Sequence, residues 1–112
     1  MPRWHAAVSS TGYGSCRSER IRLASALQTE AVDAVLGVAF PKALGYFLGS
    51  DWSPMSPRVT AFGHPGSGGS IGFADPERRF AFGLTKTRLV TALPGQDAAY
   101  LIAEATRAAL DL

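Results

Sequence analysis

The sequence predicts an α+β fold: a short antiparallel sheet of about three to four strands, a C-terminal helix packed on it, and N-terminal helices. Between residues 71 and 84, apolar residues alternate with small or polar ones at the period of two typical of half-buried strands. Residues 96–111 instead carry an apolar stripe at helical spacing, which consists of Ala98, Ile102, Ala105 and Ala109 with Leu101 and Leu112. Because the predicted strands cluster between predicted helices, the pattern favours α+β.

Length and composition set limits on the function. The chain has 112 residues, enough for one domain, and we expect residues 1–112 to form a single domain. Eleven basic and nine acidic side chains give a net charge of +2 and are scattered, which does not support nucleic-acid binding. No apolar run approaches the roughly 18 residues of a membrane span. No apolar signal core follows Met1, so the expected location is cytoplasmic.

The N-terminal third is predicted to hold a loop and two helices. Residues 1–15 are small and turn-prone, which favours a loop. Apolar residues on one side and arginines on the other predict a short amphipathic helix over residues 16–27. A second helix over residues 30–36 is indicated by Thr29 as its cap and Gly37 as its end.

The middle of the chain is predicted to contain two strands and a loop. Residues 44–48 favour a short strand, and residues 59–64 favour a strand that leads into a glycine-rich bend. Prolines and serines between them predict an exposed loop over residues 49–58. In that loop, Trp52 and Met55 either rim a cleft or fold back onto the surface, and the second interpretation is the more common one.

A glycine-lined bend precedes a predicted hairpin. Gly66, Gly68 and Gly69 allow unusual dihedral angles and let another group approach the backbone closely. Residues 75–78 form the predicted hairpin turn, followed by a strand over residues 80–86. The glycines indicate either a structural bend or a ligand-binding place, and physical reasoning on the residues leaves both open.

Several kinds of site find little support in the sequence. His5 and His64 are the only histidines and no Cys-x-x-Cys occurs, so we expect no metal and no cofactor. The lone Cys16 excludes an internal disulfide and is either a nucleophile or, more commonly, a small hydrophobic residue. Residues 66–70 lack the Gly-Lys-Ser/Thr of a phosphate loop, although an anion-binding module there stays an alternative. Residues 68–72 match Gly-x-Ser-x-Gly but lie between strands, not between a strand and a helix.

The run from Phe62 to Gly83 resembles the C-terminal part of the serine β-lactamase-related family, which includes class C β-lactamases, penicillin-binding proteins and class VIII esterases. In that family a strand carries a Lys-Thr-Gly or His-x-Gly triplet at the edge of the active site, followed by a glycine pair and a hairpin. His64-Pro65-Gly66 stands in the position of that triplet. The resemblance implies a partial β-lactamase/transpeptidase-like fold, with residues 1–112 as a C-terminal fragment of the domain.

The resemblance also implies roles for individual residues. His64 would be a catalytic residue that offers a hydrogen bond or a proton, and Gly66 and Ser67 would bind substrate. The N–H of Ser67 would polarise the attacked carbonyl. Pro65 replaces the usual threonine, so that hydroxyl contact is lost. The substrate of the complete fold would be a small-molecule ester or β-lactam, attacked by serine and released by water.

The sequence departs from the family where the attacking group should be. The nucleophile motif Ser-x-x-Lys does not occur, because Ala39 and Gly83 lie three positions before Lys42 and Lys86. No Tyr-x-Asn occurs either. Acyl transfer then has no way to start, so we expect the chain to be inactive alone, as a truncated product or as one that needs a complementing chain.

The alternative prediction is a small non-catalytic α+β interaction domain. If the N-terminal hairpin of the parent sheet is missing, the strand over residues 80–86 has an open edge, and open edges recruit other strands. A homo-oligomer or a complementing chain would then associate through this strand. The sequence leaves open the substrate, the oligomeric state and whether the chain folds alone.

Overall fold

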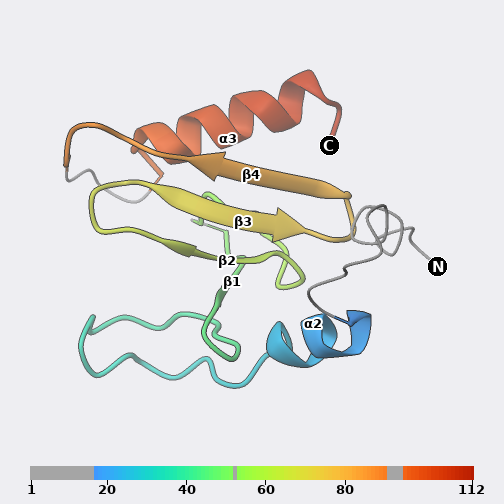
Figure 1. The fold of residues 1–112 in the computed structure, drawn as a ribbon. Coiled ribbons are helices and arrows are strands. Elements are labelled where there is room, and N and C mark those ends of the chain that lie inside the picture. Colours follow the sequence, from blue (N-terminus) through green and yellow to red (C-terminus); the bar gives the residue numbers. More distant parts are fainter. Residues whose placement is uncertain (1–16, 52, 91–94) are drawn as a thin grey trace.

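The computed structural model describes residues 17–51, 53–90 and 95–112. These residues form a four-stranded antiparallel sheet with a short helix before it and a longer helix after it (Figure 1). The elements in chain order are α2 (Ser18–Ala24), β1 (Phe47–Leu48), β2 (Phe62–Pro65), β3 (Ile71–Asp75), β4 (Phe80–Leu84) and α3 (Ala98–Ala109). The predicted α+β class, strand number and C-terminal helix are confirmed. Within these ranges, no helix is long and apolar enough to cross a membrane.

The sheet is an antiparallel meander with strand order β1-β2-β3-β4. A long loop joins β1 to β2, and two consecutive hairpins join β2 to β3 and β3 to β4. In the central strand β3, Phe73 lies opposite Gly63 of β2 on one side and Phe82 of β4 on the other. A turn over residues 76–79 joins β3 to β4, within one residue of the prediction. The glycine bend is itself the connection of the first hairpin: the Gly66 N–H donates to the Ser70 carbonyl at 2.7 Å.

The core lies on one face of this sheet. Phe73 and Phe80 are buried there, with ring centroids 5.8 Å apart in an edge-to-face arrangement. The buried cluster consists of Met55, Ala61, Ile71, Phe73, Phe80, Ala99 and Ala103. Figure 1 shows α3 running along the sheet on the side of β4. The Arg107 guanidinium of α3 lies 5.7 Å from the Phe73 ring centroid, which adds a cation–π contact between helix and sheet.

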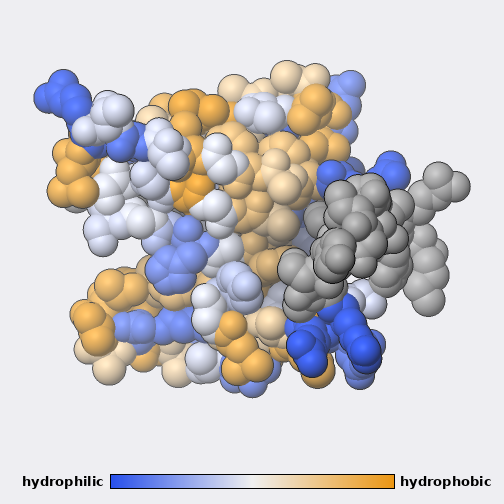
Figure 2. Space-filling view, in the orientation of Figure 1, coloured by the Kyte–Doolittle hydropathy of each residue, from blue (hydrophilic) through white to orange (hydrophobic). Residues whose placement is uncertain are grey.

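The buried face of α3 differs from the predicted one. The sequence pattern placed Ala98 and Ile102 toward the core, but the structure buries Ala99 and Ala103, one position later. Leu101 and Ile102 are exposed, Ile102 at 43% of its surface. The sheet face already presents bulky phenylalanines, so the helix packs closely only through its smallest side chains. Figure 2 accordingly shows hydrophobic side chains at the surface over α3.

The helix predicted over residues 30–36 is wrong. The segment folds back along the residues that follow it, and it turns at Gly37, whose φ is +70°. The isolated bridges are Thr29 with Lys42 and Val32 with Ala39. Thr29 Oγ1 accepts the N–H of Ala31 at 3.1 Å, which is a turn contact and not a helix cap. Threonine favours caps and turns alike, so this signal did not separate the two.

Asp33 holds this turn together. Its Oδ1 accepts the N–H groups of Val35 and Leu36, both at 2.8 Å. Its Oδ2 accepts from the Lys42 ammonium, with which it forms an ion pair. The Lys42 hydrogen bond, followed by the two amide hydrogen bonds, lowers the pKa of Asp33 from 3.8 to about 2. The ionised carboxylate is therefore the form that the folded turn favours.

Other predicted elements are shorter in the structure. Within residues 16–27, only the seven residues of α2 are helical among those that the structure describes. The strand predicted over residues 44–48 is reduced to β1, because Gly45 adopts a φ of +80° and turns the chain. The strand predicted over residues 59–64 begins only at Phe62. The loop predicted over residues 1–15 lies outside the described part of the chain, as does Cys16.

The loop over residues 49–58 is less exposed than predicted. Ser53, Met55 and Ser56 are buried, and Met55 belongs to the core at 2% exposure. The interpretation that Met55 folds back onto the surface is therefore wrong. Trp52 lies outside the described residues.

Acid should loosen the turn around Asp33. Its folded-state pKa of about 2 lies below the ordinary 3.8, so its contribution to stability is present above pH 3.8 and is lost as pH falls through 2. We expect a carboxyl titration midpoint near pH 2 in NMR spectra, and faster amide exchange at Val35 and Leu36 in the same range. In Lys42→Met, the midpoint should rise toward 3.8. A midpoint of 3.8 in the unmodified chain would contradict this assignment.

Candidate functional site

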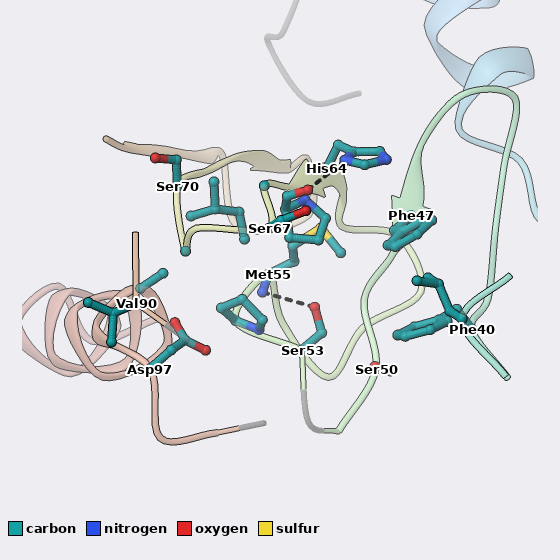
Figure 3. A pocket seen from close by; sticks show the side chains of 17 residues that line it. Phe40, Phe47, Ser50, Ser53, Met55, His64, Ser67, Ser70, Val90 and Asp97 are labelled. Atoms are coloured by element: carbon teal, nitrogen blue, oxygen red, sulfur yellow. Dashed lines mark hydrogen bonds between the residues drawn. The ribbon is translucent and has the colours of Figure 1, made fainter. Parts of the chain in front are cut away.

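The three predicted site residues lie together at the end of β2. His64 belongs to the strand itself, and Gly66 and Ser67 follow directly in the bend. All three line a cavity of about 380 Å³, drawn in Figure 3. The cavity lies between the bend, the loop that follows β1 and the beginning of α3. Residues that are adjacent in the sequence thus face segments from distant parts of the chain.

Gly63 fixes the position of β2 within the sheet. A Cβ at this position would lie 2.2 Å from the Gly72 carbonyl oxygen and 2.6 Å from the Phe73 Cα. Both are backbone atoms of β3, so a side chain could fit only if the two strands moved apart. The triplet that begins one residue later is therefore held by the tightest packing in this part of the sheet.

The walls of the cavity are mainly apolar. The Phe40 and Phe47 rings stack with centroids 5.1 Å apart and planes at 16°. The apolar lining residues are Leu36, Phe40, Phe47, Pro54, Met55, Pro65, Ile71, Val90 and Ala99. Figure 3 shows Phe40 and Phe47 together at one side of the cavity and Val90 at the other. Such a cavity can accept an apolar group and exclude water from polar groups beside it.

His64 lies at the rim, on the side of Phe47. Its ring centroid is 4.8 Å from that of Phe47, and its Nδ1 is 2.7 Å from the Pro65 carbonyl oxygen. A carbonyl only accepts, so Nδ1 carries the proton in this contact and Nε2 is left available to a ligand. The cross-strand row from His64 continues through Gly72 and Gly83. Without side chains in that row, a second hollow of about 320 Å³ opens beside His64.

The N–H of Ser67 is available to a ligand. In the bend, the Gly66 N–H donates to the Ser70 carbonyl and the Gly69 N–H donates to the Gly66 carbonyl at 2.9 Å. Among the described residues, the Ser67 N–H has no hydrogen-bond partner. Ser67 is also exposed. An oxygen atom of a ligand could therefore accept this hydrogen bond without displacing a protein group.

Other glycines of the bend are approached by the chain itself. A Cβ at Gly69 would lie 2.7 Å from Lys86 Nζ, and one at Gly68 would lie 2.5 Å from Leu89 Cδ1. The Lys86 N–H donates to Ser70 Oγ at 3.2 Å and so anchors this crossing. At Gly68 and Gly69 the structure therefore favours the structural interpretation of the glycines.

Sequence reasoning missed four polar residues that line the cavity, namely Ser50, Ser53, Ser70 and Asp97. Asp97 caps α3 by accepting the Tyr100 N–H at 3.0 Å, and it also lines the cavity. The Oγ of Ser50 is buried and has no partner among the described residues. An aspartate directly before an apolar helical stripe is a sequence signal that could have identified Asp97 as a cap. We find no sequence signal that would have identified Ser50.

This arrangement can bind a ligand and polarise a carbonyl group. Among the described residues, it contains no activated nucleophile. Ser53 Oγ accepts the Met55 N–H at 3.2 Å, and Ser70 Oγ accepts the Lys86 N–H. In this part of the chain, no serine hydroxyl is hydrogen-bonded to His64. The described residues also contain no group of three or more His, Cys, Asp or Glu side chains that could hold a metal.

Comparison with known proteins supports a relation to the β-lactamase-related hydrolases. Over 50 residues, the chain is 44% identical to the esterase/beta-lactamase LipL of Mycobacterium tuberculosis. The match covers 45% of this chain and 12% of LipL, so the chain corresponds to a small part of that protein's length. No family model matches the chain. No solved structure matches it either.

Alanine substitutions at Gly63 and Gly72 should show whether the close approach of β2 to β3 excludes a side chain at Gly63. Gly72 controls for the effect of replacing a strand glycine where space is free. We expect Gly63→Ala to lower the free energy of unfolding by about 2–3 kcal/mol, because the new Cβ meets backbone atoms of β3. Gly72→Ala, where nothing lies within 4 Å of the new Cβ, should change it by less than about 1 kcal/mol. Urea denaturation measures both. Equal losses in the two variants would contradict the close approach at Gly63.

Proposed function

We propose that this chain is the C-terminal segment of a β-lactamase-related serine hydrolase, with residues 1–112 as one part of that domain. It forms one wall of an acyl-transfer site. One observation carries the proposal: His64, Gly66 and Ser67 line one cavity, and the Ser67 N–H has no partner among the described residues. The name of LipL, an esterase/beta-lactamase, supports the same class of reaction.

Ser67 supplies a hydrogen-bond donor to the reacting carbonyl. When a serine attacks an ester or a β-lactam, the carbonyl oxygen becomes negatively charged. A backbone N–H aimed at that oxygen stabilises the transition state by about 3 kcal/mol, and it needs no reorganisation during the reaction. In this proposal the N–H of Ser67 is one donor, and the N–H of the nucleophile is the other.

His64 acts on the substrate or on the proton-transfer network. Its Nδ1 is engaged with the Pro65 carbonyl, which leaves Nε2 to accept a hydrogen bond from a ligand. When protonated, the same nitrogen donates a hydrogen bond instead, so His64 can pass a proton to a leaving group. The exposure of the ring at the rim leaves this nitrogen accessible from the cavity side and from the second hollow.

The nucleophile comes from outside this sequence. No Ser-x-x-Lys occurs in the 112 residues, and the described serines of the cavity are not paired with a base. The attacking serine and its lysine would therefore belong to another part of a longer protein or to a complementing chain. The substrate of the assembled site would be a small-molecule ester or β-lactam.

A chimera tests the proposal. We expect a complete β-lactamase-related hydrolase that carries residues 59–84 of this chain in place of its own triplet hairpin to keep ester hydrolysis. In that chimera, Ser67→Pro removes the N–H and should lower kcat by about 10²–10³, whereas Ser67→Ala keeps the N–H and should change kcat by less than about threefold. The 112-residue chain alone should not turn over a chromogenic ester or cephalosporin. Equal kcat values for the two variants would contradict the role of Ser67.

A second candidate function is association through β4. This strand pairs only with β3, so its other edge is unpaired among the described residues. Ala81 and Gly83 on it are exposed and small, and no charged side chain stands in its five residues. Natural edge strands are commonly protected by charges or prolines, so this edge is open to strand addition.

Concentration-dependent association would support the second candidate. We expect the chain to shift from monomer toward dimer in size-exclusion chromatography as its concentration rises. Ala81→Lys adds a charge on the edge strand and should return the chain to the monomer. Ala31→Lys, the same substitution at an exposed position outside the four strands, serves as the control for altered net charge. A monomer at every concentration would rule this candidate out.

A further inference from the structure

Among the described residues that line the cavity beside the bend, one has a carboxylate side chain. That side chain is Asp97, while the other lining residues are apolar or neutral, apart from His64 at the rim. A single carboxylate in an otherwise apolar cavity determines which charge a ligand can carry there. It favours donors and cations and disfavours anions.

The geometry leaves part of the Asp97 carboxylate available. Its Oδ1 accepts the Tyr100 N–H and so fixes the side chain at the first turn of α3. No lysine, arginine or histidine forms an ion pair with it among the described residues. Figure 3 shows the carboxylate turned toward the middle of the cavity. A ligand could therefore reach a carboxylate oxygen without breaking an existing ion pair.

A second polar group on the wall is also unpaired. The Oγ of Ser50 is buried and has no hydrogen-bond partner among the described residues. A buried hydroxyl without a partner is unfavourable, and rotation of the Ser50 side chain toward the cavity would let a polar ligand atom relieve that cost. The apolar space between these polar groups is bounded by the Phe40 and Phe47 rings and by Met55.

We propose that this cavity binds an apolar group that carries an N–H donor, an ammonium or a primary amide, with Asp97 as the specificity-determining acceptor. The apolar part lies against Phe40, Phe47 and Met55, and the donor meets the Asp97 carboxylate. Ligands with a carboxylate at the same place are disfavoured by like-charge repulsion. As the substrate class of the proposed hydrolase site, this inference rests on the proposed function, but binding itself needs no reaction.

Binding of three unreactive probes to the full 112-residue chain tests the inference. The probes are n-hexylammonium, hexanamide and hexanoate, which share one apolar chain and differ in charge. Met55 is buried on the cavity wall, and Met1 is the only other methionine, so the Met55 methyl signal in carbon-13 NMR reports binding directly. We expect n-hexylammonium to bind about three- to tenfold more tightly than hexanoate, with hexanamide between them.

Two matched variants identify the cause of that preference. Asp97→Asn removes the charge but keeps a side chain that can cap α3, and the affinity ratio should fall to about one. Asp111→Asn makes the same charge change at an exposed position beyond α3 and should keep the ratio. The inference is overturned if hexanoate binds as tightly as n-hexylammonium, if Asp97→Asn keeps the ratio, or if no probe shifts the Met55 signal. Equal kcat values for the two Ser67 variants of the chimera would refute the acyl-transfer role. That result would not affect the conclusion drawn from the binding of the three probes.

Discussion

The close approach of β2 to β3 at Gly63 is the constraint on which the candidate site depends. No side chain fits there, because Gly72 and Phe73 backbone atoms occupy its space. Phe73 in turn is buried beside Phe80 and Phe82, so β2 is fixed against the buried core of the protein. A backbone donor such as the Ser67 N–H is useful only if it is held in place before the substrate arrives. The glycine provides that rigidity by bringing the two strands together.

The same packing brings α3 to the cavity. Ala99 and Ala103 let the helix lie close to the phenylalanine face, which puts its N-terminal residue Asp97 next to the bend. At the other end of the helix, the Arg107 guanidinium donates to the Pro54 carbonyl at 3.0 and 3.2 Å. This double contact ties the loop that carries Met55 to α3. The cavity therefore has walls from several segments, and three of them contribute Met55, Ile71 and Ala99 to one core, so a change in the core would change the cavity's shape.

Local sequence patterns predicted those elements that are determined by neighbouring residues. Alternation over residues 71–84 and the turn chemistry that follows β3 gave the hairpin, because strand period and turn are local properties. The helix predicted over residues 30–36 was wrong, because the Asp33 side chain accepts hydrogen bonds from turn amides and from Lys42 and does not support a helix. His64, Gly66 and Ser67 were predicted from a family resemblance carried by contiguous residues, and the structure brings all three to one cavity. Asp97 meets them only through tertiary packing, which no local pattern encodes.

Polarisation of a carbonyl and attack on it make different demands on a protein, and this chain is suited to the first. Polarisation needs backbone donors fixed by a rigid sheet, and the bend after β2 offers the Ser67 N–H there. Attack needs a hydroxyl paired with a base, and among the described residues Ser53 and Ser70 use their hydroxyls to accept backbone N–H groups instead. Ligand recognition depends on the cavity wall and not on the attacking group. In the proposed function, ligand selectivity therefore resides in this segment, and the chemical step resides in another part of the assembled site.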